Sequence, residues 1–180
     1  MKPSLEQLTA QFTALVAERA SVSHESLTAS ATDPKSIQPA AAPAAPPPKS
    51  PIQAADPALK GYHFDATVAP TQVVAAAEIM DRSGFALDTI TGVDWIAQNE
   101  MELVYDFFHP EVNFRAVVRA RVPRANPELP TISPVFPGAN WHERETHDFF
   151  GIRFLGHPQL TPFLLPEDAD FHPLLKDYRP

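Results

Sequence analysis

Residues 101–122 read MELVYDFFHPEVNFRAVVRARV, and this stretch decides the fold class. Residues 101–108 and 114–122 each place apolar side chains at every second position, which is typical of β-strands that bury one face. The five residues between them, 109–113, suit the loop of an antiparallel hairpin. The stretch therefore predicts two adjacent antiparallel strands that share an apolar face.

A helix and a third strand are predicted just before this hairpin. Residues 70–83 begin with a proline, carry one apolar helical face and are followed by Gly84, a residue that commonly ends a helix. Residues 85–91, FALDTIT, predict a strand. A helix packed on a small, mostly antiparallel sheet is an α+β fold, which we expect of an α/β domain at residues 59–137.

Three arginines, Arg115, Arg119 and Arg121, share the polar face of the last predicted strand. A stripe of this kind can bind an anion or an acidic partner. More commonly it is the solvated face of a sheet that is covered on one side only. We interpret it as a solvated face and keep anion or acidic-partner binding as the alternative.

The N-terminal segment, residues 1–33, contains a short predicted helix. Apolar residues recur at steps of three and four from Leu5 to Val16, which indicates one face of an amphipathic helix. Ser4 is placed to cap this helix, and Gln7 stands three residues later, as in a capping box. A helix of this length is marginal by itself, so it either docks on a partner surface or frays.

Residues 34–58 are predicted to form a linker. Residues 34–57 contain 8 prolines and 7 alanines. Proline cannot donate a backbone hydrogen bond and alanine offers little surface to bury, so extended conformers are favoured. We expect a semi-rigid tether between the N-terminal helix and the domain.

The overall composition narrows the function. The 180 residues include 14 lysines and arginines and 22 aspartates and glutamates, for a net charge of −8, which argues against nucleic acid as the main partner. The sequence has no cysteine, so it holds no disulfide, cysteine nucleophile or cysteine-ligated iron–sulfur cluster. No run approaches the ~18–20 apolar residues that span a bilayer, and we expect a soluble or peripheral protein.

A second helix is predicted at residues 140–150, NWHERETHDFF. Asn140 is a good N-cap, and Glu143 stands at the capping-box position. Arg144 and Asp148 are four residues apart and are expected to pair along one face of the helix. Charged groups flanked by aromatic residues are typical of an interface helix.

The same helix raises the alternative of a metal site. His142 and His147 are five residues apart, which turns them about 140° from each other on a helix, so both would not grip one ion. Glu143 and His147 are four apart and can share a site, although a weak surface pair is more common. An independent metal-dependent hydrolase using His142, Glu143 and His147 is kept as an alternative.

The C-terminal stretch resembles a known family. FPGANWHERETHDFFGIRFLGHPQLTPFLLPED at residues 136–168, followed by HPLLKDY at 172–178, is similar to the signature region of the thirty-kilodalton subunit of NADH:quinone oxidoreductase, which is also called complex I. That family includes the related subunits of energy-converting nickel–iron hydrogenases and formate hydrogenlyases. His147 stands where respiratory members usually have an aromatic residue, and in this respect the chain looks nearer to the hydrogenase branch.

The resemblance implies a cofactor-free accessory subunit of the hydrophilic arm of a complex-I-like oxidoreductase. It would dock on the large quinone-site or nickel–iron subunit, beside small iron–sulfur subunits, on the cytoplasmic side of the cell membrane, and electrons would pass through its neighbours. No catalytic, metal or cofactor-binding residue is expected in this chain. The residues expected at the partner interface are Trp141, Glu143, Arg144, Glu145, Asp148, Gly151, Gly156, His157, Pro158, Lys176, Asp177 and Tyr178.

Residues 138–180 are thus predicted to be a signature helix followed by an extended docking tail. Five prolines after residue 151 leave the tail few means of pairing its own backbone. It is expected to lie over its own domain or a neighbour, and to gain order from a partner. A free-standing binding module tethered by the linker is a further alternative.

Overall fold

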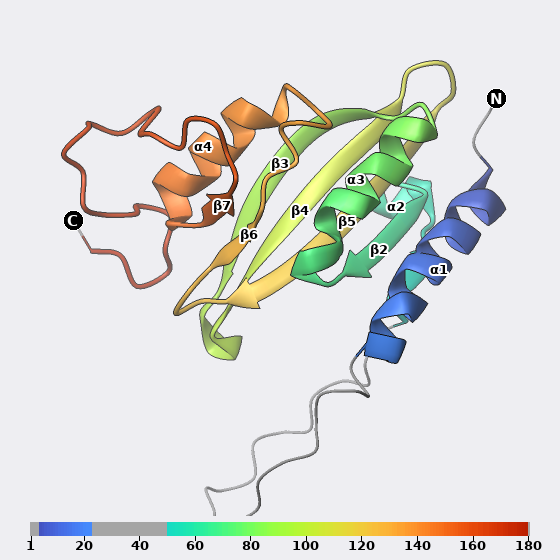
Figure 1. Ribbon diagram of the computed structural model, residues 1–180, viewed down its shortest axis with the longest axis horizontal. Coiled ribbons are helices and arrows are strands. Elements are labelled where there is room, and N and C mark those ends of the chain that lie inside the picture. The colour runs from blue at the N-terminus through green and yellow to red at the C-terminus, as the bar shows by residue number, and fades with distance from the viewer. Residues whose placement is uncertain (1–3, 23–49, 180) are drawn as a thin grey trace, which may run out of the picture.

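The computed structural model describes residues 4–22 and 50–179 and is built on a five-stranded sheet in the order β1-β2-β5-β4-β3 (Figure 1). The strands are β1 (Ile52–Ala54), β2 (Phe64–Val68), β3 (Ala86–Trp95), β4 (Glu100–His109) and β5 (Phe114–Pro123). Neighbouring strands are antiparallel except β2 and β5, which are parallel. The predicted α+β class with a mostly antiparallel sheet is confirmed.

The hairpin predicted from residues 101–122 is formed by β4 and β5. Leu103 lies opposite Ala120 and Tyr105 opposite Val118, and all four side chains are buried. Alternation along both strands therefore places one continuous apolar face toward the core. The third predicted strand is also present, and as β3 it continues four residues beyond the predicted end at residue 91.

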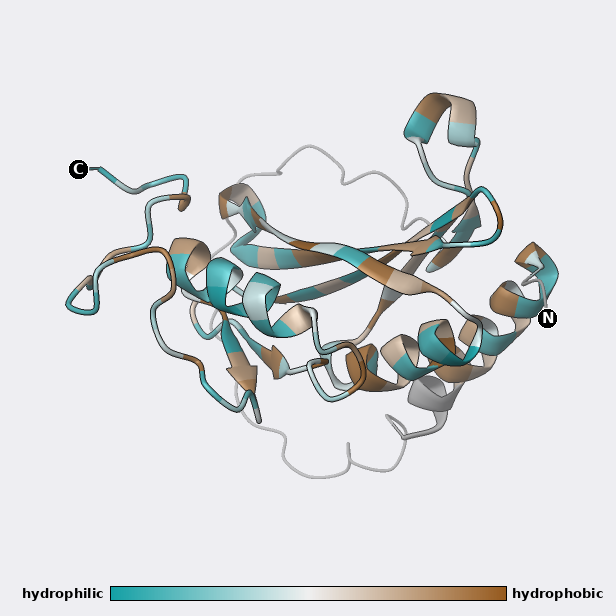
Figure 2. Ribbon diagram, turned by 90° about the horizontal axis from the view of Figure 1, so that it is seen from above, coloured by the Kyte–Doolittle hydropathy of each residue, from teal (hydrophilic) through white to brown (hydrophobic). Residues whose placement is uncertain are grey.

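The three long helices cover the same face of the sheet and leave the opposite face open (Figure 2). They are α1 (Leu5–Val22), α3 (Val73–Arg82) and α4 (Ala139–Phe150). The helix predicted at residues 70–83 starts with a short 3₁₀ turn, η1 (Pro70–Gln72), before it becomes α3. Two further short elements are α2 (Pro57–Lys60) and the 3₁₀ turn η2 (Ile96–Gln98).

Helix α1 docks on its own sheet. Ser4 and Gln7 form the predicted capping box, because the side chain of each accepts from the backbone N–H of the other. Leu8 and Phe12 are fully buried, and the Phe12 ring meets the Phe64 ring of β2 edge-on at 5.1 Å. The apolar stripe of this helix is therefore part of the hydrophobic core.

Several short elements have no counterpart in the sequence predictions. Strand β1 lies within residues 34–58, which are predicted to be linker, and helix α2 begins there; β1 pairs with β2. A second sheet pairs β6 (Glu128–Pro130) in parallel with β7 (Arg153–Leu155). This small sheet ties the proline-rich segment after β5 to the chain that follows α4.

The arginine stripe lies on the open face of the main sheet, where each arginine contacts carboxylates. Arg115 contacts Asp88 and Asp106, Arg119 contacts Asp65 and Glu102, and Arg121 contacts Glu100 and Glu102. Three arginines face five carboxylates, so this surface carries no excess of positive charge with which to hold an anion.

Helix α4 reaches the sheet at a place where β3 has no side chain. A Cβ on Gly92 would lie 2.6 Å from Cδ2 of Phe150, so only glycine lets the ring come this close. Helix α4 packs more extensively on β3 than on any other element. Within the described part of the chain, no helix has both the length and the apolar character needed to cross a membrane.

Candidate functional site

The predicted cap of α4 is wrong. The helix starts at Ala139 with Gly138 as its N-cap, and Asn140 makes no capping hydrogen bond. Glu143 instead points into the core, where its carboxylate accepts from the Thr131 hydroxyl and, at 2.8 Å, from the Ile132 backbone N–H. The carboxyl group at the capping-box position thus binds residues 131 and 132, a contact that no local sequence pattern predicts.

Burial sets the protonation of this site. It raises the pKa of Glu143 to about 7, although the two hydrogen bonds oppose the shift. His157 lies with its Nε2 3.9 Å from the Glu143 carboxylate, and burial lowers its pKa. The hydroxyl of buried Tyr105, which has no hydrogen-bond partner among the described residues, has a raised pKa because of burial and of the nearby Glu143 charge.

The predicted pair between Arg144 and Asp148 does not form, because each side chain bonds the tail instead. Arg144 donates to the backbone carbonyls of Thr161 at 3.1 Å and Pro162 at 3.0 Å. Its guanidinium also lies over two neighbouring aromatic rings, 5.4 Å from the centre of Trp141 and 4.9 Å from that of Phe163. A planar cation here joins the helix to the tail.

Asp148 holds the next residues of the tail. One carboxylate oxygen accepts three consecutive backbone N–H groups, from Phe163, Leu164 and Leu165, at 2.8, 2.6 and 3.1 Å. Burial alone would raise the pKa of Asp148, but the three N–H donors outweigh it and lower the pKa below its ordinary value. The carboxylate therefore remains charged and substitutes for the regular backbone pairing that the prolines prevent.

The turn after α4 is shaped by two histidines. Gly151 ends the helix with φ +73°, and a Cβ there would lie 2.7 Å from the His172 ring. His172 Nδ1 lies 2.8 Å from the Asp148 backbone oxygen, and His147 Nδ1 lies 2.9 Å from the Ile152 oxygen. The glycine of the signature is thus needed both for its backbone conformation and for the space that His172 occupies.

The end of the tail is fixed at the far end of β3. Asp94, whose side chain is fully buried, accepts from Arg124 through both carboxylate oxygens and from the Lys176 backbone N–H at 2.8 Å. Arg124 also binds Asp177, and this contact lowers the pKa of the Asp177 carboxyl. Asp94 and Arg124 are absent from the predicted interface, since a strand-end aspartate and a loop arginine carry no local signal of their pairing.

The other predicted interface residues lie on the same end of the molecule. Gly156 has φ +80° in the turn after β7, Glu145 and Pro158 are exposed, and the Tyr178 ring stacks on Phe171 at 5.6 Å. The structure thus brings together residues that are up to 37 positions apart in the sequence, from Trp141 to Tyr178. Figure 1 shows α4 and the tail, in orange and red, at one end of the sheet.

The metal alternative finds no support in the geometry. Glu143 is buried against Thr131, and His147 turns toward the Ile152 carbonyl, so the expected pair between them is wrong. Across residues 4–22 and 50–179, no group of three or more histidine, aspartate or glutamate side chains is arranged to hold a metal ion.

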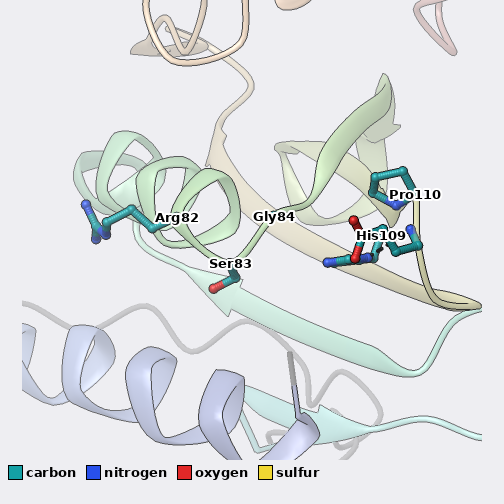
Figure 3. Close-up of a pocket in the computed structure, with 6 residues that line it drawn as sticks. Arg82, Ser83, Gly84, His109 and Pro110 are labelled. Carbon is teal, nitrogen blue, oxygen red and sulfur yellow. Dashed lines mark hydrogen bonds between the residues drawn. The ribbon is translucent and has the colours of Figure 1, made fainter. Parts of the chain in front are cut away.

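A separate cavity of about 240 Å³ opens between the end of α3 and the turn from β4 to β5 (Figure 3). It is lined by Arg82, Ser83, Gly84, His109, Pro110 and Glu111. His109 Nδ1 accepts from the Glu111 backbone N–H, and the Arg82 side chain turns away from the histidine. The cavity includes none of the residues predicted to form the interface.

Comparison with known proteins assigns the family. A sequence model described as "Respiratory-chain NADH dehydrogenase, 30 Kd subunit" matches residues 66–180, which include all of α4 and the tail. The chain belongs to this family. The match begins inside β2, so α1 and β1 lie outside it.

The relatives are named as subunits of more than one oxidoreductase. Over 92 residues the chain is 42% identical to the C subunit of NADH-quinone oxidoreductase from Roseiflexus castenholzii, covering 51% of this chain and 53% of that protein. Over 96 residues it is 42% identical to the C subunit of F(420)H(2) dehydrogenase from Methanosarcina mazei, covering 51% and 59%. The chain thus spans little more than half the length of these relatives.

A longer match is found with the C subunit of NADH-quinone oxidoreductase from Moorella thermoacetica, 34% identical over 123 residues, which covers 67% of this chain and 83% of that protein. Among solved structures, a chain of the membrane-bound sulfane sulfur reductase, described as an archaeal respiratory membrane complex, superimposes with a TM-score of 0.60 at 30% identity. The superposition covers 64% of this chain and 71% of the other.

Proposed function

We propose that this chain is an accessory subunit of a complex-I-like, membrane-bound oxidoreductase, and that α4 and the tail dock it on a large neighbouring subunit. Family membership supports the general role. The large neighbour holds the quinone site or a nickel–iron centre in this proposal, and small iron–sulfur subunits lie nearby. The chain itself holds no cofactor, and it stays on the cytoplasmic side of the membrane through the complex.

One observation supports docking through α4 and the tail in particular. Most polar groups of the signature bond the chain to itself, whereas several of its large apolar groups are exposed: Trp141 is 54% exposed and Leu164 is 53% exposed. Burial of such groups is the main source of affinity at protein interfaces. A scaffold that fixes its own backbone and exposes aromatic and aliphatic side chains suits a docking role.

The electron donor and acceptor are a separate question from docking. Proteins named for NADH, for F(420)H(2) and for sulfane sulfur all resemble this chain. We propose that the chain makes no distinction among these substrates, because the docking surface lies within residues 66–180, the part that matches the family.

Affinity purification tests the proposed role. The full chain, tagged in its native host, should be recovered from mildly solubilised membranes with a large subunit and small iron–sulfur subunits. Recovery of the chain alone would contradict the proposal.

Arg144→Ala tests the docking site. Removing the guanidinium breaks the hydrogen bonds from α4 to residues 161 and 162 and the cation–π contact with Phe163, so we expect assembly to weaken more than the isolated fold does. Arg82→Ala is the matched control, because Arg82 makes only an exposed pair with Glu78, of a kind worth about 0–1 kcal/mol. Equal thermal destabilisation with normal assembly would contradict the docking role of Arg144.

A further inference from the structure

Five large apolar side chains are exposed on α4 and the tail. They form what we call the apolar ridge: Trp141, Phe163, Leu164, Phe171 and Leu174. The other four exposed large apolar side chains of the described residues lie outside α4 and the tail that follows β7: Leu59 on α2, Trp95 at the end of β3, Ile96 in η2 and Leu155 on β7. Exposed apolar groups concentrated on one end of a protein mark an interaction surface.

The ridge is held in place by polar contacts beneath it. Phe163 lies 5.1 Å from Trp141, and its backbone, with that of Leu164, is bonded to the Asp148 carboxylate. The Leu174 backbone N–H donates to the Phe149 oxygen at 3.1 Å, and Phe171 stacks on Tyr178. The chain's own contacts thus hold the ridge residues, and groups held in this way lose less entropy on binding.

Acidic side chains accompany the ridge. The acidic rim consists of Glu145 on α4 and of Glu167, Asp168 and Asp170, which lie in the tail between Leu164 and Phe171. All four are exposed, and within residues 4–22 and 50–179 none of them makes an ion pair. By contrast, each arginine on the open face of the sheet is already paired with a carboxylate.

We propose that the ridge and the rim together recognise a partner surface on which an apolar groove is flanked by lysine and arginine side chains. The inference rests on the proposed function and specifies the chemistry of the docking partner. Buried aromatic and aliphatic anchors supply affinity at such an interface, while charges at its edge set orientation and the rate of association.

The net charge of the chain favours a basic protein surface over other kinds of binding partner. A second copy would bring another net charge of −8, so two acidic rims would repel each other. Nucleic acid and anionic lipid surfaces are negative as well. A basic protein surface is the occupant that complements all four carboxylates.

The charge half of the inference is tested by Glu167→Lys combined with Asp170→Lys in the full chain. The control is Asp81→Lys combined with Glu111→Lys, which changes net charge equally at exposed acidic residues outside the rim. The readout is the fraction of tagged chain retained on the solubilised complex as NaCl rises from about 0.1 M to about 1 M, over which the screening length falls from about 10 Å to about 3 Å.

We expect wild-type retention to fall with salt, and the Glu167/Asp170 variant to bind about tenfold more weakly at low salt, the effect of a change near 1.4 kcal/mol. The Asp81/Glu111 variant should behave like wild type. Retention of the Glu167/Asp170 variant at the level of its control, or retention that is independent of salt, would overturn the inference.

The apolar half is tested by Leu164→Gln against Leu59→Gln, because Leu59 is 83% exposed on α2 and lies outside the ridge. Leu164→Gln should lower retention several-fold at every salt concentration, whereas Leu59→Gln should not. Unchanged retention of Leu164→Gln, or a salt-sensitive homodimer in place of the complex, would overturn the inference. If the wild-type chain recovers no large subunit, the proposed function fails too. If the wild type assembles and neither set of substitutions alters retention, only this inference fails.

Discussion

Asp94 and Arg124 form a two-pronged ion pair, with Nε 2.9 Å from Oδ1 and Nη2 3.1 Å from Oδ2. The Asp94 side chain is fully buried, and it also accepts the backbone N–H of Lys176. One carboxylate thus joins the end of β3, the loop after β5 and the end of the tail. Two residues that no motif singles out therefore position part of the proposed docking surface.

Asp94→Ala should strongly destabilise the fold. The change removes a buried charged acceptor from Arg124, which keeps only its contact with Asp177, and from the Lys176 N–H, and hydrogen bonds to charged groups are worth about 1.5–3 kcal/mol each. The free energy of unfolding, measured by urea denaturation of the full chain, should fall by that order. Asp88→Ala is the control, since its pair with Arg115 is exposed and such pairs are worth about 0–1 kcal/mol. Equal losses for the two variants would show that burial does not matter here.

Asp148→Ala should release the tail without unfolding the sheet. The backbone N–H groups of residues 163–165 lose a charged acceptor, and hydrogen bonds to charged groups are worth about 1.5–3 kcal/mol. Amide hydrogen exchange at these residues should accelerate by about tenfold or more, since 1.4 kcal/mol corresponds to a factor of ten. Glu145→Ala, an exposed change on the same helix, should leave these amides protected; protection in Asp148→Ala would refute the assignment.

The lowered pKa of Asp148 predicts that the tail is less stably held in acid. The pKa of Asp148 is lower in the folded state than its ordinary value of 3.8, so its contribution is complete above that pH. The contribution is lost as the pH falls below 3.8 through the lower folded value. Residues 163–165 should lose protection in that range in the wild type, whereas in Asp148→Ala their protection should not change with pH.

How much of the fold can be predicted depends on whether a pattern is local. Alternation along residues 101–122 is enough to place β4, β5 and their buried face, because the period of two is a property of each strand alone. Strand β2 escapes prediction because its five residues, FDATV, include Asp65, a poor strand former. Its carboxylate is used by Arg119, 54 positions away, which no local pattern reveals.

The site is harder to predict for the same reason. The spacing of Arg144 and Asp148 makes a helical pair geometrically possible. Both side chains instead bind the tail, at Thr161 to Leu165, where the prolines leave backbone groups in need of partners. The residues of the signature can be identified from their types, but their contacts depend on how a proline-rich segment folds back onto the helix.

Glu143→Gln should change how stability depends on pH between about 5 and 8. The folded state raises the pKa of Glu143 from its ordinary 4.5 to about 7, so in this range the folded protein holds a proton that the unfolded chain has released. The contribution of Glu143 therefore becomes less favourable as pH rises from 4.5 to 7, by a few kcal/mol at about 1.4 kcal/mol per pKa unit. Glutamine is neutral and similar in shape, and it lacks this dependence.

The measurement is urea denaturation of both proteins at several pH values. We subtract the unfolding free energy of Glu143→Gln from that of the wild type. This difference should fall as the pH rises and level off above about 7. His157 faces Glu143, and its lowered pKa gives the opposite slope near its own range; because His157 is present in both proteins, most of its contribution cancels. A difference that stays constant from pH 5 to 8 would mean that Glu143 does not titrate in this window.

Phe12→Ala tests whether α1 belongs to the folded domain. The family match begins at residue 66, yet Phe12 is fully buried, lies edge-on to Phe64 and extends the core over β2. Replacing a buried phenylalanine with alanine typically costs about 3–5 kcal/mol, the sum of lost apolar burial and the cavity left behind. We expect a loss of that order in the free energy of unfolding, whereas Thr13→Ala, one position along on the exposed face, should change it little. Equal, small effects of the two changes would show that the helix contributes little to the fold.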